Sequence, residues 1–596
     1  MNKKIGIILT TGIIIAVGIA AIFMWNKKDA IPNEVDVVVV GGEPEGVAAA
    51  ISAARNGASV ILIEHRDELG GLFTYGMLNF LDIPQGPDGE SVSRGIFEEW
   101  HKLVGSQSAF DVELAKQVFR QMVEAEDNIT LLTETDVVAV QKDGNQVVGL
   151  TYKNADGEFD VKAESFIDAT QDADFSVMAG APYFVGGEDI GIEDKKMAVT
   201  LMIHLNNVDW DGVREEAASG KFGEAVVTNT AAWGFVELTR MYKPIEENTR
   251  LRGLNLAKVG DDYYINALQI FGINGLDEAS KAEGIERGKR EIDHIVAYLK
   301  AELKGFENAV IASYPPELYV RETRHIIAEY QLPMADVWTN RNHWDNIAYA
   351  SYPVDIQAQT PQDYGYIVSA PTAYAIPFRS IVPKEIDGLV VVGRSAGFSS
   401  IAAGSARIVP TGMAVAEAAG AAAAQLKDTE QSFRQLSQDE AGIKKLRATL
   451  MAQGAYVENI ETTYPYAGEW YDEAVQQLMN YGLIFGRYDN NLLVDNPSTV
   501  QYFTNLIADT LYRTNRSTYD VNEELILTAK EEAVSRAKEE LTPEATLQVL
   551  TGMLNVSAEE LLANADFKEA WSYVEVEQQI KLKHVYSIAH ALMTFE

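Results

Sequence analysis

One segment near the start of the chain constrains the fold more than any other. Residues 35–64 read VDVVVVGGEPEGVAAAISAARNGASVILIE, in which two apolar stretches flank a glycine turn and an alanine-rich stretch. The pattern predicts a strand over 35–40, a helix over about 45–55 with Gly57 as its end, and a strand over 59–63. This is a βαβ unit, so we expect a parallel sheet with a helix on its face.

The glycine turn and the acid that follows the second strand predict a dinucleotide site. A helix N-terminus holds a pyrophosphate where glycines let the backbone come close, and an acid at the next strand end takes ribose hydroxyls. Gly41, Gly42 and Gly46 supply the turn, and Glu64 follows Gly41 by 23 residues. The G-x-G-x-x-G spelling is incomplete, because Glu43 stands where the second glycine would be. A purely structural βαβ unit is the alternative.

Neighbouring residues extend this candidate site. Pro44 and Glu45 begin the expected helix, and Glu45 brings another carboxylate, which a phosphate site would accept only if the acids pointed to solvent. Beyond Glu64, Gly70 and Gly71 lead a glycine-rich stretch. Missing side chains there would allow a large planar cofactor to approach the backbone closely.

Composition narrows the classes of function. The chain has 596 residues, of which 47% are hydrophobic, so several domains and a large core are expected. The formal charge is −38, and a field of that sign repels phosphate backbones, so nucleic acid is not an expected partner. The sequence contains no cysteine, which excludes disulfides, thiolate catalysis and cysteine-ligated iron–sulfur clusters. No metal site is predicted.

The N-terminal residues 5–25 are uncharged and almost wholly apolar. A helix of that length rises about 1.5 Å per residue and would span a hydrocarbon core of roughly 30 Å, so we predict an uncleaved transmembrane helix as anchor. Lysines flank it on both sides, so its orientation is weakly specified. The expected location is the cell membrane, single-pass, with the folded domains extracytoplasmic. A cleaved signal peptide and a cytoplasm-facing orientation are the alternatives.

Four segments together carry a family resemblance. GGEPEG at 41–46, IEHRDELGG at 63–71, FIDATQDAD at 166–174 and the stretch 374–424 resemble the FAD-dependent oxidoreductase family, including relatives of the flavin part of heterodisulfide reductase. The resemblance implies a two-dinucleotide-binding-type flavoprotein with FAD as cofactor. Its fold would be α/β, with a Rossmann-like FAD-binding domain and an inserted α+β substrate domain.

The resemblance also implies which residues hold FAD. Segment 166–174 resembles the family's A-T-G-D-x-D turn with Gln171 in place of glycine, and a glutamine in the left-handed conformation would keep that turn. The strand expected over 388–393 and the helix over about 407–425 resemble the part that contacts the flavin, where helix N–H groups stabilise a reduced ring. The implied contacts are Gly41, Gly42, Pro44, Glu45, Gly46, Glu64, His65, Arg66, Gly70, Gly71, Leu72, Val137, Ala169, Thr170, Gly393, Arg394, Arg407 and Ile408.

The region between 184 and 372 is expected to form the substrate domain. Alternating stretches at 198–205 and 262–270 predict strands, and 277–304 predicts a charged helix. GGEDIG at 186–191 lacks a flanking strand and helix, so we interpret it as a loop and expect no second nucleotide site. Hydride delivery from NAD(P)H is therefore not indicated.

Two clusters in this region are candidates for catalysis. Residues 321–324 resemble the family's R-E-[ST]-R segment, whose guanidiniums would hold a carboxylate or a negative flavin; an ion-paired strand edge is the alternative. Residues 352–357 resemble a D-x-H segment with Gln357 in place of histidine. His325 and His204 remain as proton carriers, and Tyr374 and Arg379 as pocket residues. The catalytic candidates are Arg321, Arg324, His325 and Arg379.

The chain divides into an FAD-binding domain in two parts, 33–183 and 373–428, the cap at 184–372 and an all-α C-terminal module at 429–596. Residues 464–513 resemble one S-layer homology repeat, which implies a cell-wall polymer as partner, although 499–502 read TVQY where the family has T-R-A-E. A helical docking module is the alternative.

These patterns predict a membrane-anchored, FAD-dependent oxidoreductase that acts on an unidentified small-molecule substrate by hydride transfer to or from flavin. The alternative is a non-catalytic cell-envelope protein on a degenerate flavoprotein scaffold. Glu43, Gln171 and Gln357 are the evidence for that alternative, because each replaces a residue of the family pattern.

Overall fold

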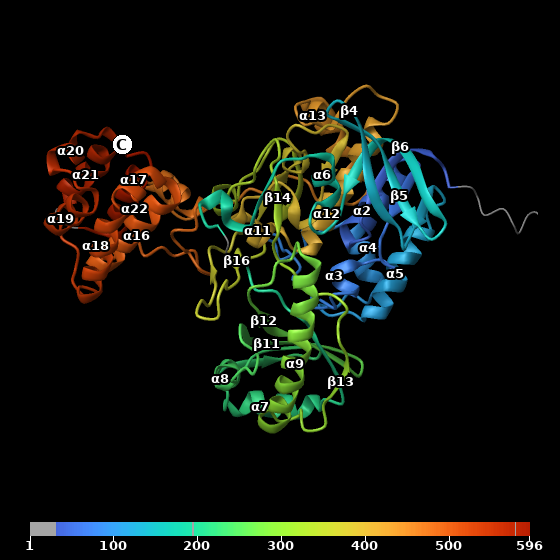
Figure 1. Cartoon of the computed structure of the whole chain (residues 1–596), viewed down its shortest axis with the longest axis horizontal. Coiled ribbons are helices and arrows are strands. Elements are labelled where there is room, and N and C mark those ends of the chain that lie inside the picture. The colour runs from blue at the N-terminus through green and yellow to red at the C-terminus, as the bar shows by residue number, and fades with distance from the viewer. Residues whose placement is uncertain (1–30, 194–195, 578–579, 596) are drawn as a thin grey trace, which may run out of the picture.

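The computed structural model describes residues 31–193, 196–577 and 580–595. It has three lobes (Figure 1): a sheet lobe built from residues 33–183 and 373–452, a cap lobe around residues 203–313, and a helical C-terminal lobe from residue 472 onward. The membrane anchor predicted over 5–25 lies outside the described residues. Among the described residues, none of the helices combines the length and apolar character that a membrane crossing needs.

A seven-stranded sheet organises the sheet lobe, in the order β3-β2-β1-β6-β5-β4 with β19 beside β6. Strand β1 pairs in parallel with β2 and β6, and β19 also joins β6 in parallel, whereas β4, β5 and β6 form an antiparallel meander. The strands are β1 Glu34–Val40, β2 Val60–Ile63, β3 Ile129–Leu132, β4 Asp136–Asp143, β5 Gln146–Asn154, β6 Gly157–Asp168 and β19 Leu389–Val391. The predicted Rossmann-like sheet is confirmed.

Helices α2 (Pro44–Arg55) and α12 (Val409–Leu426) pack against each other through small residues. A Cβ added at Gly420 would lie 2.1 Å from the carbonyl oxygen of Ala49, so the two backbones are in direct contact. The Ser52 hydroxyl donates to the carbonyl oxygen of Glu417 at 2.6 Å. This packing brings the N-terminal βαβ unit and helix α12 together, because their small residues allow the two backbones to approach closely. The other helices of this lobe are α3 Gly71–Thr74, α4 Ile96–Leu103, α5 Val112–Glu124, α6 Asp174–Ala179, α11 Ser400–Ala406, α13 Phe433–Leu436 and α14 Glu440–Ala452.

The cap lobe is a six-stranded antiparallel sheet in the order β13-β8-β12-β11-β10-β9. Its elements are β8 Ile203–Asn206, α7 Trp210–Ser219, β9 Ala225–Val227, β10 Ala231–Gly234, α8 Val236–Met241, β11 Thr249–Val259, β12 Asp262–Ile270, α9 Glu278–Glu302 and β13 Val310–Ser313. The strand predicted at 262–270 and the helix predicted at 277–304 are present. The strand predicted at 198–205 is wrong in its first half, because Val199 and Thr200 form isolated bridges instead.

Short elements connect the lobes. The segment 186–191 interpreted as a loop forms a short 3-10 helix over Gly186–Ile190. Strand β14 pairs with β7, β18 with β15, and β17 with β16. Their bounds, with that of the nearby helix, are β7 Tyr183–Val185, β14 Arg324–Ile326, α10 Met334–Trp338, β15 Asn346–Ala350, β16 Asp355–Ile356, β17 Tyr366–Ile367 and β18 Tyr374–Pro377.

The C-terminal lobe consists of helices α15 Asp472–Asn480, α16 Val500–Thr514, α17 Arg516–Val521, α18 Glu523–Ser535, α19 Pro543–Leu554, α20 Ala558–Ala563, α21 Ala565–Glu577 and α22 Leu582–Ala591. The segments before α16, α19 and α22 meet through bridges between Pro497 and Lys581 and between Thr499 and Glu540. Helices α15 and α16 form the helix–loop–helix unit expected near 464–513, and its assignment to the S-layer homology family stays a prediction.

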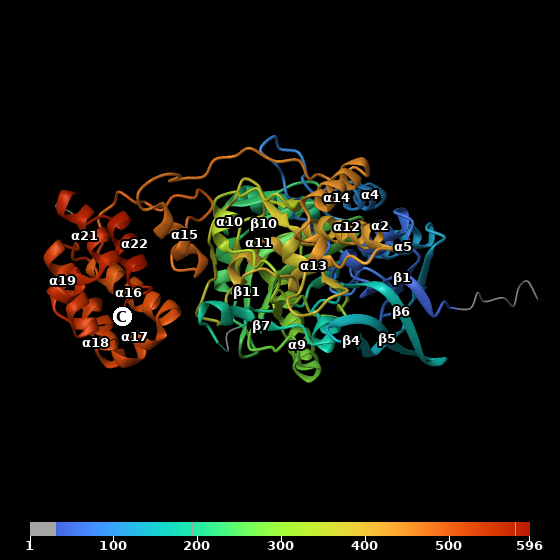
Figure 2. The same cartoon turned by 90° about the horizontal axis from the view of Figure 1, so that it is seen from above.

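A loop of the C-terminal lobe is bonded to the rest of the molecule. Figure 2 shows the segment between α14 and α15 running along the body toward this lobe. After α15, the N–H of Gly486 donates to the carbonyl oxygen of Val368 at 2.7 Å. The Asn490 side chain exchanges two hydrogen bonds with the backbone of Ala370, at 2.9 and 2.8 Å. The loop 482–491 is therefore held by hydrogen bonds against the segment 368–370, outside the C-terminal lobe.

Candidate functional site

The glycine turn between β1 and α2 is a tight backbone cradle. Gly41 has φ of +101°, and a Cβ added there would lie 2.6 Å from the carbonyl oxygen of Ala169. A Cβ at Gly46 would lie 1.8 Å from the carbonyl oxygen of Gly41. Helix α2 starts at Pro44 without a side-chain cap. No side chain caps the N–H groups that follow Pro44, so this helix start can face an anion, and only glycine fits at positions 41 and 46.

The segment Ala169–Thr170 closes the other side of this cradle. The buried carboxylate of Asp168 holds it by accepting from the N–H and hydroxyl of Thr170, at 2.9 and 2.7 Å. The same carboxylate accepts from the N–H and hydroxyl of Ser176, at 2.7 and 2.6 Å. Four hydrogen bonds on one side chain fix the turn that faces Gly41.

Glu64, at the end of β2, is 1% exposed and aimed at the turn. Its carboxylate accepts from the N–H of Gly42 and, at 2.8 Å, from the N–H of Arg66. Burial raises its pKa, but the hydrogen bond from His65 and the charge of Arg66 outweigh burial and hold the pKa of Glu64 below its ordinary value. An ionised carboxylate in this position suits ribose hydroxyls, as the sequence predicted.

The Gly70–Leu72 turn and Arg66 form an anion site that Glu43 occupies. Gly70 and Gly71 have φ of +100° and +36°, and the N–H of Leu72 donates to Oε2 of Glu43 at 2.9 Å. Nη2 of Arg66 lies 3.0 Å from Oε1 of Glu43. Burial raises the pKa of Glu43. Consecutive backbone donors beside a guanidinium make a concavity for an anion, and here the chain's own carboxylate lies in it.

Two departures from the family pattern contact each other. Nε2 of Gln171 donates to Oε1 of Glu43 at 3.0 Å, and Nη1 of Arg394 donates to Oε1 of Gln171 at 3.0 Å. Arg394 also pairs with Asp172 at 2.6 Å. The expectation of a left-handed Gln171 is wrong, because Ala173, with φ of +54°, takes that conformation instead. Glutamine at 171 thus gives the carboxylate at 43 a hydrogen-bond partner.

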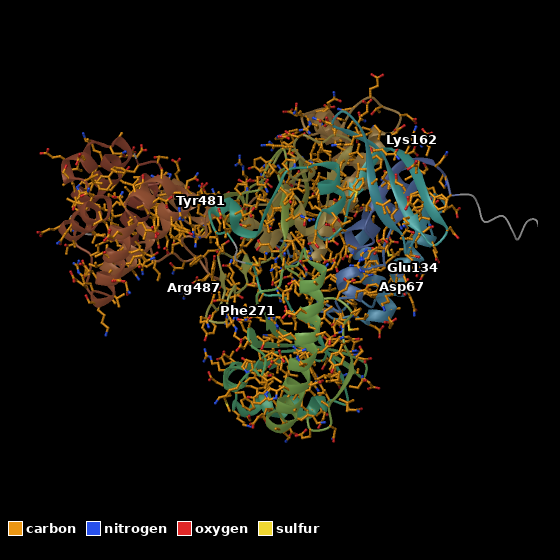
Figure 3. All side chains as sticks on the ribbon, in the orientation of Figure 1. Asp67, Glu134, Lys162, Phe271, Tyr481 and Arg487 are labelled. Carbon is orange, nitrogen blue, oxygen red and sulfur yellow. The ribbon has the colours of Figure 1, made fainter. Side chains whose placement is uncertain are left out.

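A cavity of about 1080 Å³ lies between the sheet lobe and the cap sheet. Val409 and Pro410, the first residues of α12, line it, and α12 has no side-chain cap, so the positive end of that helix faces the cavity. Figure 3 shows Arg487, the neighbour of the lining residue Tyr488, where the C-terminal lobe faces the cap lobe. The residues that line the cavity include Leu72, Phe73, Leu78, Phe80, Asp82, Trp233, Arg252, Asn255, Asn266, Gln269, Tyr319, Arg321, Tyr352, Asp355, Gln357, Arg394, Arg407, Ile408 and Tyr488.

Two arginines line this cavity, Arg321 buried and Arg407 half-buried. Nη1 of Arg407 donates to the hydroxyl of Tyr319 at 2.9 Å, and its Nε has no partner. Arg321 is 6% exposed, donates to the carbonyl oxygen of Ala198 at 2.9 Å, and lies 4.1 Å from the Tyr319 ring centroid. Within the described part of the chain neither arginine forms an ion pair. Both guanidiniums therefore keep charge available for a bound anion or a negative flavin.

Two carboxylates, Asp82 and Asp355, face the same space. Asp82 is exposed at the cavity wall, but loss of water around its carboxyl and the nearby charge of Asp355 raise its pKa to about 6, against the charge of Arg407 and an interaction with Tyr352. Like charges in one site separate the protonation behaviour of two acids, which is typical of acid–base chemistry. No motif in the sequence points to Asp82, which is a single acid in an apolar loop.

A chain of hydrogen bonds fixes Asp355. Nε of Arg250 donates to Oε1 of Gln269 at 3.0 Å, and Nε2 of Gln269 donates to Oε1 of Gln357 at 3.0 Å. Gln357 in turn donates to the carboxylate of Asp355. The glutamine that replaces the family's histidine thus positions an acid.

The predicted site residues divide between the cavity and its surroundings. Leu72, Arg321, Arg394, Arg407 and Ile408 line the cavity. The glycines, Glu64, His65, Arg66, Ala169 and Thr170 surround the cradle, with Pro44 and Glu45 at the start of α2. Gly393, with φ of +80°, follows β19 near Glu45, and Val137 lies in the sheet opposite Tyr152.

The remaining catalytic candidates lie away from the cavity wall. Arg324 pairs with Asp174 at 2.6 Å, and Arg379 pairs with Asp345 at 2.8 Å. His325 is 1% exposed and lies 3.2 Å from Glu322. Catalytic roles for Arg324, His325 and Arg379 stay predictions.

Two other candidates are also engaged elsewhere. His204 lies between Asp262 and Ser313 on the cap sheet, at 2.8 Å from each. The buried Tyr374 donates to Ser405 at 2.8 Å.

The residues present fit FAD. A Cβ would fill the glycine cradle, Glu64 is ionised at the ribose position, and Arg407, whose Nε has no partner, lines a cavity beside a helix N-terminus. Glu43 is the exception, since its carboxylate takes donors that suit a phosphate. Among the described residues, no His, Asp and Glu side chains are grouped as a metal site requires.

Comparison with known proteins gives one family and several distant likenesses. The family described as FAD dependent oxidoreductase matches residues 36–450. Digeranylgeranylglycerophospholipid reductase of Methanocella arvoryzae is 29% identical over 163 residues, which make up 23% of this chain and 39% of that protein. The chain therefore spans well under half the length of this curated relative.

Two solved structures show limited similarity to the chain. The p-nitrophenol 4-monooxygenase PnpA from Pseudomonas putida has a TM-score of 0.35 and 10% identity, covering 76% of this chain and 95% of that one. A geranylgeranyl bacteriochlorophyll reductase-like protein from Thermoplasma acidophilum has a TM-score of 0.32 and 14% identity, covering 89% and 99%.

Proposed function

We propose, from the premise that the chain belongs to the FAD dependent oxidoreductase family, that it oxidises or reduces a small organic substrate in the cavity beneath the cap sheet. The chain is an oxidoreductase with FAD as its cofactor. The observation that carries the proposed site is the Asp82–Asp355 acid pair beside the N-terminus of α12. Family membership favours this enzyme over the non-catalytic scaffold.

The chain's own residues divide the work of holding the cofactor. Glu64 would bind ribose hydroxyls, the Gly41–Gly46 turn would take the pyrophosphate, and the start of α12 would face the flavin ring. When bound, FAD supplies hydride transfer. Arg321 and Arg407 would stabilise negative charge in the cavity, because both line it and neither forms an ion pair among the described residues.

Asp82 is the group that we propose moves the proton. With its pKa raised to about 6, its carboxylate takes a proton from a substrate hydroxyl at neutral pH and releases that proton to solvent afterwards. Tyr352 lines the cavity with Asp82, and Gln357 donates a hydrogen bond to the carboxylate of Asp355. The bond from Gln357 fixes Asp355 before substrate binds.

The partial relative suggests a second substrate class. Its name gives a digeranylgeranyl lipid as substrate, and the apolar side of the cavity, with Leu72, Phe73, Leu78 and Phe80, would suit an isoprenoid chain. A small polar substrate and an isoprenoid lipid are therefore the two candidate substrate classes.

We also retain a single-pass membrane anchor over residues 5–25, with the catalytic domain outside the cytoplasm. The support for it is the uncharged apolar run and the lack of cysteine. A cell-wall polymer as partner of the C-terminal lobe rests on the resemblance at 464–513 alone.

The test is spectroscopic. The purified full chain should show the absorption bands of oxidised flavin, and a true substrate should bleach them in the absence of oxygen. Asp82→Asn should bind FAD equally well but bleach far more slowly. A full chain that rejects added FAD, or an Asp82→Asn variant that bleaches at the normal rate, would remove the proposed site.

A further inference from the structure

Three polar side chains on the cap wall of the cavity have no protein partner. Arg252, Asn255 and Asn266 line the cavity, and within the described residues their side chains take part in no hydrogen bond or ion pair. Asn255 lies directly opposite Asn266 in the register of β11 and β12. Asn255 is exposed and Asn266 half-buried, so both amides are open to the cavity, and the matched pair is available to a ligand.

Two exposed aromatic rings border the same cavity from different lobes. Trp233, on β10 of the cap sheet, is 42% exposed, and Tyr488, from the C-terminal lobe, is 70% exposed. Large rings are costly to leave in water, and both rings line a ligand-sized space. A ligand with an apolar face would cover them.

The polar groups specify the rest of the ligand. A carboxamide donates and accepts hydrogen bonds at once, a carboxylate accepts and a guanidinium donates, so Asn255, Asn266, Asp82 and Arg252 together match groups that both donate and accept. Adjacent hydroxyl groups have that property. An isoprenoid chain has no such groups and would leave the amides of Asn255 and Asn266 unpaired.

We infer that the cavity binds a carbohydrate, with ring hydroxyls on the Asn255–Asn266 pair and the apolar sugar face on Trp233, while Tyr488 borders the same space. This substrate class rests on the proposed function for the reaction, but sugar binding can be measured without turnover. The remaining acids and arginines of the wall then face the hydroxyl or carboxyl groups at the other end of the sugar.

The experiment uses the full chain loaded with FAD and five probes: cellotriose, xylotriose, mannotriose, digalacturonate and geranylgeraniol. Saturation-transfer NMR reports binding, and anaerobic flavin bleaching is recorded separately. We expect at least one sugar to bind, and Trp233→Ala and Asn266→Ala each to weaken it at least tenfold.

Trp344→Ala is the matched control, because Trp344 is 41% exposed and lies outside the cavity wall. We expect it to bind the sugar normally.

The outcomes separate the inference from the function. A sugar that binds through Trp233 and Asn266 without bleaching the flavin supports the inference and removes the proposed function for that class. Geranylgeraniol that binds or bleaches, while all four sugars fail, overturns the inference and leaves the oxidoreductase function standing. Sugar binding that survives both Trp233→Ala and Asn266→Ala also overturns it.

Discussion

The cofactor cradle and the cavity beside it differ in whether their polar side chains, Glu43 against Asn255 and Asn266, have hydrogen-bond partners within the protein. In the cradle, the carboxylate of Glu43 already has protein partners: Arg66, the N–H of Leu72 and the Gln171 side chain. In the cavity, Asn255 and Asn266 are open to a ligand. The contrast shows that the cradle satisfies the carboxylate of Glu43 with the chain's own donors. The amides of Asn255 and Asn266 on the cavity wall would gain hydrogen bonds only from a ligand or water.

The largest expected effect comes from breaking the cradle's backbone contact with Gly46→Ala. The added carbon would lie 1.8 Å from the carbonyl oxygen of Gly41, and relief requires a backbone shift that costs on the order of 3 kcal/mol. FAD affinity should fall by at least about 100-fold, as measured by quenching of flavin fluorescence.

The control for this substitution is Gly552→Ala, in the interior of α19. A Cβ there would meet no atom within 4 Å, so FAD affinity should not change and the lobe should gain about 0.5–1 kcal/mol. Normal FAD binding by Gly46→Ala would show that the turn is not the pyrophosphate site.

The next effect tests the cavity. Asp82→Asn should slow flavin bleaching by substrate about 100-fold at neutral pH, because a positioned base is typically worth that factor or more. With the pKa of Asp82 at about 6, the normal rate should rise with pH through 6 and then level, since the base must be ionised. In Asp82→Asn that step should be absent, while Asp127→Asn, an exposed acid outside the cavity wall, should keep it. If Asp82→Asn still shows the pH step near 6, the catalytic base is a residue other than Asp82.

Glu45, a buried acid of the cradle, should make the free energy of unfolding depend on pH. Burial, with the charge of Glu43, raises the pKa of Glu45 to about 8. The folded protein therefore holds a proton that the unfolded chain releases above about pH 4.5, and the resulting stability is lost as pH rises toward 8. Between pH 6 and pH 8 the loss should be about 2 kcal/mol in denaturant unfolding. Glu45→Gln should flatten this slope, and an unchanged slope would place the titrating group elsewhere.

The smallest effect tests whether Glu43 competes with FAD. In Glu43→Gln the amide keeps the length of the side chain but removes a buried charge from the anion site, so FAD affinity should rise about tenfold. Glu98→Gln, on the surface of α4, should leave the affinity unchanged. Weaker FAD binding by Glu43→Gln would mean that Glu43 holds Arg66 in place for the cofactor rather than competing with it.

Sequence could predict the elements whose signals are local. The βαβ unit, strand 262–270 and helix 277–304 follow from apolar periodicity and glycine positions, and the structure has all of them close to their predicted bounds. Glycines and the acid at 64 also identified the cradle, because each has a fixed place in a short motif.

The rest depended on contacts between distant segments. Asp82 and Asp355 line one cavity although they lie far apart in the chain, and Asn255 is opposite Asn266 only because of a bulged register between β11 and β12. The turn motif predicts only a backbone conformation for Gln171, whereas in the structure its side chain forms hydrogen bonds with Glu43 and Arg394. No short pattern encodes such partners.

Tyr488 has a consequence for how such proteins diversify. The family match ends at residue 450, but a loop of the C-terminal lobe supplies one wall of the cavity and is bonded to Val368 and Ala370. Loss or exchange of that lobe during evolution would replace a wall of the substrate site and leave the cofactor cradle untouched. Selection on substrate preference can therefore act on a segment outside the family's own boundary.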